Sequence, residues 1–512
     1  MANFIPSEYQ KAVFNFIKNG KGNLVINAVA GSGKTKTLEE ACKIISPDMR
    51  KQDLLFMAFN KSISQELEGR VGQYAMVKNL HQFGYSCIAK HVRRGQRINM
   101  DKVKYKKILD EIVDQNLDNR AAVIDNALTL LNLCRVNLIK HNDTYGINAI
   151  IKHHGLDIVG CEVRIVNDLL AEVYKLDMSQ DVTIDFTDMI TIPVTMNWIP
   201  YFSLVFVDEC QDLNTTEREM MRIAASRGGR FVAVGDPHQA INGFAGADCD
   251  SFAKIQALPN TTTLPLSVNY RCGRAMIDLA KAIVPEITAH DNAIDGEVKH
   301  VDELTLDLFR ENDMVLCRCT APLIAMALKL IRAGKTAKVL GRDIAENLRK
   351  MVEKSKAKTI KGFQSWVEIE KAKLAKEIAK KENITLSEAE ETGRFVAFMD
   401  RVNCILVFGE EETKLDVVLA KLNNIFAADK LANAVTLCTC HKSKGLESDR
   451  VIILLPNKLP LVWKGQLDWE YEQECNLKYV AVTRAKKELV FVDVELSSLL
   501  KTEFYQEQPK QQ

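Results

Sequence analysis

Features that mark membrane-spanning, secreted or strongly basic proteins are missing from this sequence. Lys and Arg number 68 against 67 Asp and Glu, a formal net charge of +1, so any nucleic-acid surface must be local. No apolar run approaches the roughly 18 residues that cross a bilayer. Met1 to Gln10 lacks a signal-peptide pattern, and the 13 cysteines are scattered and odd in number. We therefore expect a protein of a reducing, cytoplasmic compartment with no membrane partner.

Length and composition indicate several folded domains. The chain has 512 residues, of which 47% are hydrophobic and 26% charged, as in ordinary globular proteins. At about 100–200 residues per domain, two to four domains are expected. There is no visible internal repeat, and only the tail after Tyr505 is low in complexity. We expect that tail to be flexible.

Short apolar runs, each followed by a polar or glycine-rich loop, predict buried parallel strands. Because helical stretches alternate with these runs, the expected fold is α/β, with two domains in series built on parallel sheets. The first set of runs lies at residues 24–26, 54–57, 204–207 and 231–234, and the second at 314–316, 337–340, 435–437, 451–454 and 489–492.

Two segments interrupt the alternation and predict inserted, mainly helical subdomains. In residues 88–200 the apolar side chains recur at helical spacing. Residues 343–430 contain a Lys-rich and Glu-rich sequence with a helical pattern. A solvated helix face is the preferred explanation of these charges. In the first segment the residues that share one face are Tyr105, Ile108, Leu109, Ile112 and Val113.

A phosphate-binding loop follows the first predicted strand. Glycines let backbone N–H groups close around a β-phosphate, Lys34 reaches the β- and γ-oxygens, and Thr35 places its hydroxyl on Mg²⁺. Ala28 stands where the general pattern has glycine, so the loop alone predicts no more than phosphate binding. The expected phosphate-binding residues are Ala30, Gly31, Ser32, Gly33, Lys34 and Thr35.

Two acidic residues at the end of another predicted strand supply the second half of a P-loop ATPase. Asp208 is expected to hold Mg²⁺, and Glu209 to orient and deprotonate the attacking water. A surface acidic pair is the alternative explanation. Together with the loop, the pair predicts ATP and Mg²⁺ as ligands.

From residue 208 onward, the sequence resembles that of a known protein family. Residues 208–212, Asp-Glu-Cys-Gln-Asp, resemble the DExQD box of the UvrD/Rep/PcrA helicases of superfamily 1A. Further boxes of that family follow in order at residues 235–247, 266–271, 440–447 and 479–485. They cover both predicted strand-rich regions but neither insertion. The runs at 59–61 and 80–84 look closer to F-box-type and small phage-encoded relatives, and a phage-encoded protein would act in the host cytoplasm.

The resemblance implies two tandem RecA-like P-loop motor domains. The expected boundaries are 1–87 and 201–270 for the first motor domain, 88–200 for a helical insertion, 271–342 and 431–497 for the second motor domain, 343–430 for a shortened charged insertion, and 498–512 for the tail.

The same resemblance implies nucleotide contacts outside the loop. Gln10 is expected to read the adenine edge, while Tyr270 stacks on the adenine with Lys36 near its other face. Gly445 and Glu447 are expected at the ribose or the loop beside the nucleotide.

Three further residues are expected at the γ-phosphate. Arg271 and Arg484 would place positive charge on its oxygens as the bond breaks, and Gln239 would sense its presence. Surface arginines near helix starts are the alternative explanation of the two arginines.

Nucleic-acid contacts follow from the same boxes. Phe244 is the expected base-stacking aromatic, with core packing as its alternative role. Asn242 stands where the family commonly has tyrosine, so one aromatic contact is not expected. The residues expected to grip a single strand are Phe59, Asn60, Lys61, His81, His441 and Lys442.

Two cysteine pairs suggest zinc, but their spacing does not fit. Cys317 with Cys319, and Cys438 with Cys440, have one intervening residue, where structural zinc sites usually have two to four. We expect these cysteines to pack as small hydrophobic side chains in strands.

The expected function is that of an ATP-dependent DNA helicase, moving 3′ to 5′ on single-stranded and tailed duplex DNA as closure of the RecA-like domains follows ATP binding. A translocase that strips bound proteins without unwinding, and an inactive P-loop nucleic-acid-binding module, remain alternatives. RNA is not excluded by these residues. The chain is expected as a monomer or weak oligomer, with replication or repair proteins as possible partners.

Overall fold

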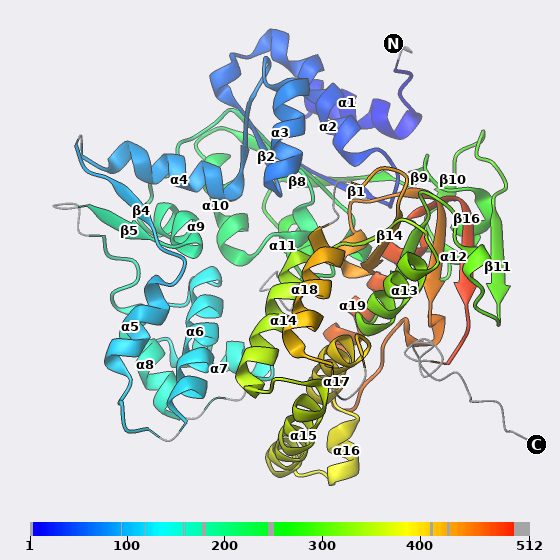
Figure 1. The fold of residues 1–512 in the computed structure, drawn as a ribbon. Coiled ribbons are helices and arrows are strands. Elements are labelled where there is room, and N and C mark those ends of the chain that lie inside the picture. Colours follow the sequence, from blue (N-terminus) through cyan, green and yellow to red (C-terminus); the bar gives the residue numbers. More distant parts are fainter. Residues whose placement is uncertain are drawn as a thin grey trace, which may run out of the picture. The chain divides into compact units, whose positions relative to one another are not determined.

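Two compact units make up the computed structural model of this chain (Figure 1). Unit 1 comprises residues 1–29 and 33–267, and unit 2 comprises residues 30–32 and 268–512. The residues described are 4–93, 95–117, 119–156, 158, 160–176, 181–243, 250–409, 413–427 and 431–495, so Phe244 and the expected flexible tail at 498–512 lie outside them.

A six-stranded, all-parallel sheet forms the centre of unit 1. Its strand order is β3-β2-β6-β7-β1-β8. Successive residues of a strand point to opposite faces, and both faces are buried, which explains the continuous apolar runs. The strands are β1 (Asn23–Ala28), β2 (Leu54–Ala58), β3 (Met76–Asn79), β6 (Leu204–Val207), β7 (Arg230–Gly235) and β8 (Thr261–Leu266).

Helices cover the two faces of this sheet. One hydrophobic cluster joins α1, α2 and α3 to one face, and another joins α4, α9, α10 and α11 to the other. The helices are α1 (Glu8–Asn19), α2 (Lys34–Ile45), α3 (Lys61–Val71), α4 (Leu80–His91), α9 (Phe186–Thr195), α10 (Thr215–Ala224) and α11 (Ser251–Gln256).

Among its described residues, the first insertion is helical apart from one short strand pair. Tyr105, Leu109 and Val113 are buried as expected, whereas Ile112 is 52% exposed and lies off that face. The fully buried Arg135 donates to both oxygens of Asp185, at 2.8 and 2.7 Å, and so ties the insertion to the start of α9. The insertion contains α5 (Lys104–Ile112), α6 (Arg120–Val136), α7 (Thr144–His153), α8 (Gly160–Leu170) and the parallel pair β4 (Ile98–Met100) and β5 (Val182–Ile184).

A buried carboxyl group in α10 makes the stability of unit 1 depend on pH. Burial raises the pKa of Glu217 to about 7, although a hydrogen bond from the Asn214 backbone opposes the rise. Between its unfolded pKa and pH 7 the folded chain therefore holds a proton that the unfolded chain has lost, so stability falls as pH rises through this window. Glu217→Gln is expected to stabilise the protein at pH 8 by up to about 3 kcal/mol, because one pKa unit equals ~1.4 kcal/mol.

Urea unfolding of wild type and Glu217→Gln at pH 5 and pH 8 measures this effect. The stabilisation should be large at pH 8 and small at pH 5, while Glu219→Gln, on the partly exposed side of α10, should change neither. Equal shifts at the two pH values would contradict a buried, protonated carboxyl group.

Unit 2 is built on a second six-stranded, all-parallel sheet. Its strand order is β11-β16-β15-β12-β14-β13. A separate parallel pair, β9 and β10, precedes these strands in the sequence. The strands are β9 (Val268–Asn269), β10 (Thr288–Ala289), β11 (Glu297–Val301), β12 (Met314–Cys317), β13 (Ala337–Val339), β14 (Val435–Thr439), β15 (Ser448–Leu454) and β16 (Ala485–Val492).

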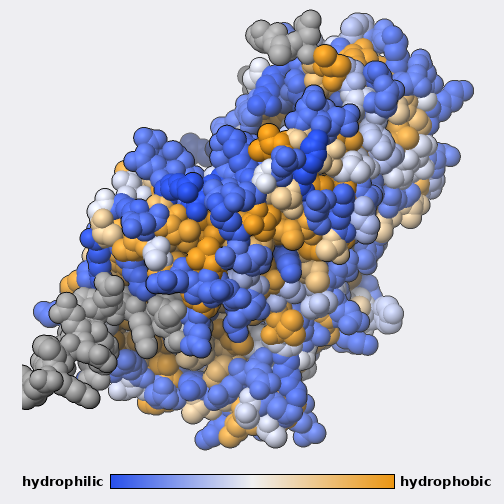
Figure 2. All heavy atoms as spheres, turned by 90° about the vertical axis from the view of Figure 1, so that its right-hand side faces the viewer, coloured by the Kyte–Doolittle hydropathy of each residue, from blue (hydrophilic) through white to orange (hydrophobic). Residues whose placement is uncertain are grey.

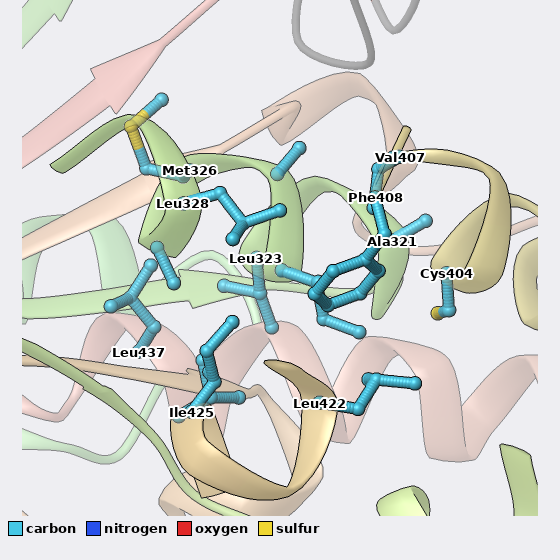
Figure 3. Close-up of a cluster of buried hydrophobic side chains, with 14 of the residues drawn as sticks. Ala321, Leu323, Met326, Leu328, Cys404, Val407, Phe408, Leu422, Ile425 and Leu437 are labelled. Atoms are coloured by element: carbon cyan, nitrogen blue, oxygen red, sulfur yellow. The ribbon is translucent and has the colours of Figure 1, made fainter. Parts of the chain in front are cut away.

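Most helices of the second insertion share the core of unit 2. Figure 3 shows side chains of α13, α17 and α18 gathered near Leu437 of β14. A small separate cluster joins Ala375 and Ile378 of α15 to Ala389 of α16, beside it in Figure 1, and to Phe395 of α17. The helices of unit 2, inside and outside the insertion, are α12 (Arg274–Ala280), α13 (Ala321–Arg332), α14 (Arg342–Ser355), α15 (Ile360–Glu382), α16 (Leu386–Glu390), α17 (Gly393–Leu406), α18 (Leu415–Ala427) and α19 (Asp468–Val482).

The predicted fold class, α/β with two parallel sheets and mainly helical insertions, is confirmed. Eight of the nine apolar runs singled out in the sequence fall wholly in a strand, and the ninth, 337–340, extends one residue beyond β13. Hydrophilic side chains cover much of the face shown in Figure 2, with apolar residues scattered between them. Within the described ranges, no helix combines the length and apolar character needed to cross a membrane.

Candidate nucleotide site and nucleic-acid residues

The loop between β1 and α2 has the backbone conformation of a phosphate cradle. Gly31 and Gly33 adopt φ angles of 64° and 79°, in the left-handed region that favours glycine. Gly33 is the N-cap of α2 and provides no side-chain cap, so the first amides of that helix are left for a ligand. Ser32 Oγ is buried and has no hydrogen-bond partner among the described residues. A phosphate oxygen fits these donors.

Lys34, Thr35, Asp208, Glu209 and Gln239 come together in unit 1. Thr35 Oγ1 donates to Asp208 Oδ2 at 2.6 Å. Lys34 Nζ lies 3.3 Å from Gln239 Oε1 and 3.8 Å from Glu209 Oε2. Lys34 and Asp208 are buried, and Glu209 is 20% exposed. The result is an ammonium group, a hydroxyl group and two carboxylates within reach of one triphosphate.

The sheet topology explains why these distant segments meet. β6, β7 and β1 are neighbours in a parallel sheet, so their carboxyl ends lie at one edge, where ligands of open α/β sheets bind. β6 ends just before Asp208, β7 ends before the turn that carries Gln239, and β1 ends at the phosphate loop.

Glu209 sits in a strained position that a second amide supports. Its φ of 53° is left-handed, which is uncommon for a residue with a side chain. Gln211 Nε2 donates to Glu209 Oε2 at 2.6 Å, and Gln211 Oε1 accepts from the backbone N of Asp236 at 3.1 Å. Gln211 thus links the ends of β6 and β7. Gln211 belongs to the DExQD box, but no separate role was predicted for it from the sequence.

Electrostatics at this edge favour a bound cation. Burial and the charge of Glu209 raise the pKa of Asp208 to about 6, against the lowering effects of the Thr35 hydrogen bond and of Lys34. Burial also raises the pKa of Asp236. Crowded, buried carboxylates gain most from a divalent cation, and hydroxyl and carboxylate oxygens are ligands that Mg²⁺ accepts. The residues present fit Mg²⁺ with a triphosphate.

The residues expected at the base lie in both units. Gln10 is buried; its Nε2 donates to Thr37 Oγ1 at 3.0 Å, and its Oε1 accepts from the Ser7 backbone. Lys36 pairs with Glu40 at 2.8 Å. In unit 2, Tyr270 is 45% exposed and its ring centre lies 4.8 Å from that of His290.

Arg271 and Arg484 differ in how firmly unit 2 holds them. Arg484 is buried and donates to the carbonyl oxygens of Val480 at 2.9 Å and Leu446 at 3.0 Å. Arg271 pairs through Nε with Glu447 at 2.6 Å and reaches the carbonyl oxygen of Thr483 at 3.3 Å. Glu447 follows Gly445, whose φ is 84°. Arg271 is thus held by one charged side chain and one backbone carbonyl oxygen, whereas the contacts of Arg484 named here are both to backbone.

The residues expected to grip a single strand fall at strand-to-helix junctions in unit 1. Phe59, Asn60 and Lys61 join β2 to α3, where the Asn60 side chain accepts from Ile63 N at 2.9 Å and caps the helix. His81 lies in the first turn of α4. Asn60 therefore has a structural role whatever else it contacts.

The two residues of unit 2 that are expected to grip a single strand, His441 and Lys442, differ in charge. His441 is partly buried, and burial, with the nearby Arg318, lowers its pKa to about 3, so its ring is neutral at pH 7. Lys442 is exposed and pairs with Asp343, at the start of α14, at 3.0 Å. His441 can therefore donate a hydrogen bond to a phosphate, but only Lys442 brings charge.

Phe186 is an exposed aromatic residue that the sequence reading missed. It is 47% exposed, its ring centre lies 6.1 Å from that of His81, and Lys102 Nζ lies 5.4 Å from its centre. The capping box formed by Asp185 and Asp188 was the available signal, because it places Phe186 at the first position of α9.

Of the four cysteines expected in strands, Cys317 and Cys438 lie in β12 and β14, whereas Cys319 and Cys440 follow these strands and Cys319 is only partly buried. Cys317, Cys438 and Cys440 are fully buried, and Leu316 and Cys438 are register partners on β12 and β14. Over the described part of the chain, no group of three or more His, Cys, Asp and Glu side chains is arranged to hold a metal ion.

Two parallel α/β sheets and a phosphate loop completed by acids from another strand of the same sheet define the fold of P-loop proteins with two RecA-like domains. The model of the UvrD/REP helicase N-terminal domain matches residues 8–259, and that of the UvrD-like helicase C-terminal domain matches residues 434–492. The chain belongs to the UvrD/Rep helicase family of superfamily 1.

Several curated relatives are ATP-dependent DNA helicases named PcrA. The protein of Staphylococcus epidermidis is 24% identical over 302 residues, which cover 52% of this chain and 38% of the relative. That of Leuconostoc citreum is 24% identical over 289 residues, covering 52% and 38%. That of Staphylococcus aureus is 23% identical over 311 residues, covering 56% and 40%. The matches thus span about two fifths of these relatives.

Proposed function

We propose that this chain is an ATP-dependent DNA helicase that moves 3′ to 5′ along single-stranded DNA and separates the duplex ahead of it. The observation that carries the proposal is the contact of Thr35 Oγ1 with Asp208 Oδ2 at 2.6 Å beside Lys34, in a chain that matches both parts of a helicase family. A hydroxyl and a carboxylate oxygen beside an ammonium group are what a metal-bound triphosphate requires.

The proposed chemistry in unit 1 uses each of the gathered residues. The amides of the loop and Lys34 bind the phosphates. Thr35 and Asp208 would hold Mg²⁺, which neutralises charge on the β- and γ-oxygens. Glu209 takes a proton from the attacking water, and its tie to Gln211 fixes the direction of the carboxylate. Gln239, at the end of β7, is placed to report whether a γ-phosphate is present, because it lies against Lys34.

Unit 2 is proposed to supply the positive charge of the transition state. Arg271 and Arg484 are the candidates, through their match to the family's fourth and sixth boxes. The difference in how they are held assigns them different behaviour. Arg484 is fixed by backbone carbonyls, whereas Arg271 can exchange the carboxylate of Glu447 for phosphate oxygens.

The proposed DNA surface of unit 1 includes Phe186 with His81 and Lys102. An exposed ring beside a histidine ring and an ammonium group offers a base a stacking face and its phosphate a positive charge. Every base has a stacking face, so such a contact works on any sequence, as translocation requires. His81 enters the surface as a neutral ring, since burial lowers its pKa.

Phe186→Ala is expected to weaken binding of single-stranded DNA by about 1–3 kcal/mol, the range measured for one base on one aromatic ring. Fluorescence anisotropy with thymine-only and mixed-sequence oligonucleotides measures the loss, which should be the same for both. Tyr145→Ala is the matched control, because Tyr145 is 87% exposed on α7 of the neighbouring insertion. Equal effects of the two substitutions would count against a stacking site at Phe186.

The direction of movement rests on the resemblance of residues 208–212 and 479–485 to the 3′-to-5′ branch of the superfamily. Strand displacement on 3′-tailed, 5′-tailed and blunt duplexes tests it, together with DNA-stimulated ATP hydrolysis. Lys34→Ala is the inactive control. The 3′-tailed substrate should be unwound and the 5′-tailed and blunt substrates should not.

Each other outcome of that assay has a defined meaning. Unwinding only from a 5′ tail would overturn the polarity. DNA-stimulated hydrolysis without strand displacement would identify a translocase that clears proteins from single strands. Hydrolysis stimulated by neither DNA nor RNA would overturn the proposed function and leave a P-loop binding module.

A further inference from the structure

Glu447 stands between two cations in unit 2. One carboxylate oxygen, Oε2, lies 2.6 Å from Arg271 Nε, and the other, Oε1, lies 2.6 Å from Lys486 Nζ. Burial raises the pKa of Glu447, but the Lys486 hydrogen bond and the charge of Arg271 outweigh it, so that the pKa is lowered and the group stays ionised. Each oxygen therefore serves one cation.

The backbone fixes all three residues in place. Glu447 directly precedes β15 and Lys486 lies in β16, and these strands pair in parallel with Ser448 opposite Ala485. The carbonyl oxygen of Lys486 also accepts from the backbone N of Gly273, two residues after Arg271. The side chain of Asn269 accepts from the backbone N of Arg271 at 2.8 Å. Only the Arg271 side chain needs to move for its guanidinium to change partners.

Lys486 limits how Arg271 and Glu447 can pair. A guanidinium and a carboxylate form their strongest pair when two parallel N–H groups meet both oxygens. Here Lys486 Nζ lies 2.6 Å from Oε1, and the shortest contact of Arg271 with Glu447, from Nε to Oε2, does not have the hydrogen-bond geometry of such a two-bond fork. With Lys486 absent, the carboxylate is free to turn and take Arg271 in a two-bond fork. Arg271 would then be harder to release.

We propose that Lys486 is a positioning residue for ATP hydrolysis: it shares Glu447 with Arg271, keeps that ion pair from closing into a two-bond fork, and so leaves the guanidinium available to the γ-phosphate. The proposal rests on the proposed function. The proposed role falls to a lysine that lies outside the family boxes named above. It also explains why the ion pair with Glu447 leaves Arg271 able to change partners.

Lys486→Met tests the proposal in the full-length chain. DNA-stimulated kcat for ATP should fall by about tenfold, within the range of coupling between contacting charged residues, while the Kd for a non-hydrolysable ATP analogue stays unchanged. Lys486→Arg should restore kcat. Lys487→Met is the matched control, because Lys487 is the next residue and pairs with Asp449 instead, at 2.7 Å. Low ionic strength is needed, since Lys486 and Glu447 are 37% and 40% exposed.

Glu447→Gln provides the decisive comparison. Removing the carboxylate charge releases Arg271 whether or not Lys486 is present, so Lys486→Met should have no further effect in that background. Effects that multiply independently, or a Lys486→Met enzyme with wild-type kcat, would overturn the proposal. A wild-type chain without DNA-stimulated hydrolysis would instead overturn the proposed function, which keeps the two failures apart.

Discussion

Arg271→Ala is expected to lower kcat for DNA-stimulated ATP hydrolysis by about 10³–10⁵, the range that an arginine acting on a transferring phosphoryl group contributes. Its side chain is 19% exposed and held by one carboxylate and one carbonyl oxygen, so the substitution removes these two polar contacts from unit 2. The Kd for ATP should change much less than kcat, because the charge matters most as the γ-phosphate bond breaks. Single-turnover hydrolysis and binding of a fluorescent ATP analogue separate the two quantities.

A neighbouring arginine provides the control for this experiment. Arg274 lies at the start of α12, three residues after Arg271, and its guanidinium donates to the carbonyl oxygens of Ala293 and Asp291 at 2.7 and 2.6 Å. Arg274→Ala removes structural bonds of the same kind but should leave the transition state untouched. An Arg271→Ala enzyme that keeps most of its kcat, or one that loses no more than Arg274→Ala does, would remove Arg271 from the proposed mechanism.

The sequence predicts central strands better than edge strands, for a physical reason. β1, β2, β6 and β7 are buried on both faces and read as unbroken apolar runs. β8 and β11 stand at sheet edges, and the exposed positions of each dilute the pattern to a few apolar residues. Pro265 within β8 is tolerated because an edge strand has one unpaired side. Edge strands of this kind carry no continuous run for a sequence reading to detect.

Candidate site residues divide in a similar way. Lys34, Thr35, Asp208 and Glu209 could be predicted because each follows a recognisable strand, and parallel strands bring their carboxyl ends to one edge. Contacts that depend on the direction of a side chain or on strand register could not be predicted from the sequence. Lys486 meets Glu447 only because Ser448 pairs with Ala485, and no local pattern encodes that register.

The second large effect is expected at Glu209. Glu209→Gln should lower kcat by about 10²–10⁴, the usual contribution of a general base. An amide keeps the size of the side chain, and its oxygen can still accept from Gln211, so the left-handed backbone at this position should survive. What the substitution removes is the ability to take a proton from water.

The same substitution should not weaken the binding of Mg²⁺ and ATP, although it slows hydrolysis. The charge of Glu209 is one of the causes that raise the pKa of Asp208 to about 6. Glu209→Gln removes that charge, lowers the pKa of Asp208 and makes its carboxylate more fully ionised near pH 6, where a metal ligand must be ionised. We therefore expect a variant that binds Mg²⁺ and ATP at least as well as wild type, most visibly at pH 6, yet hardly turns over.

Isothermal titration with Mg²⁺ and a non-hydrolysable ATP analogue, set beside single-turnover hydrolysis, measures both effects. Glu219→Gln, on the partly exposed side of α10 and paired with Arg222, should change neither quantity. If Glu209→Gln weakened nucleotide binding as much as it slowed hydrolysis, Glu209 would be a ligand rather than a base. If it slowed hydrolysis no more than Glu219→Gln, the base would have to be sought elsewhere along the edge where β6, β7 and β1 end.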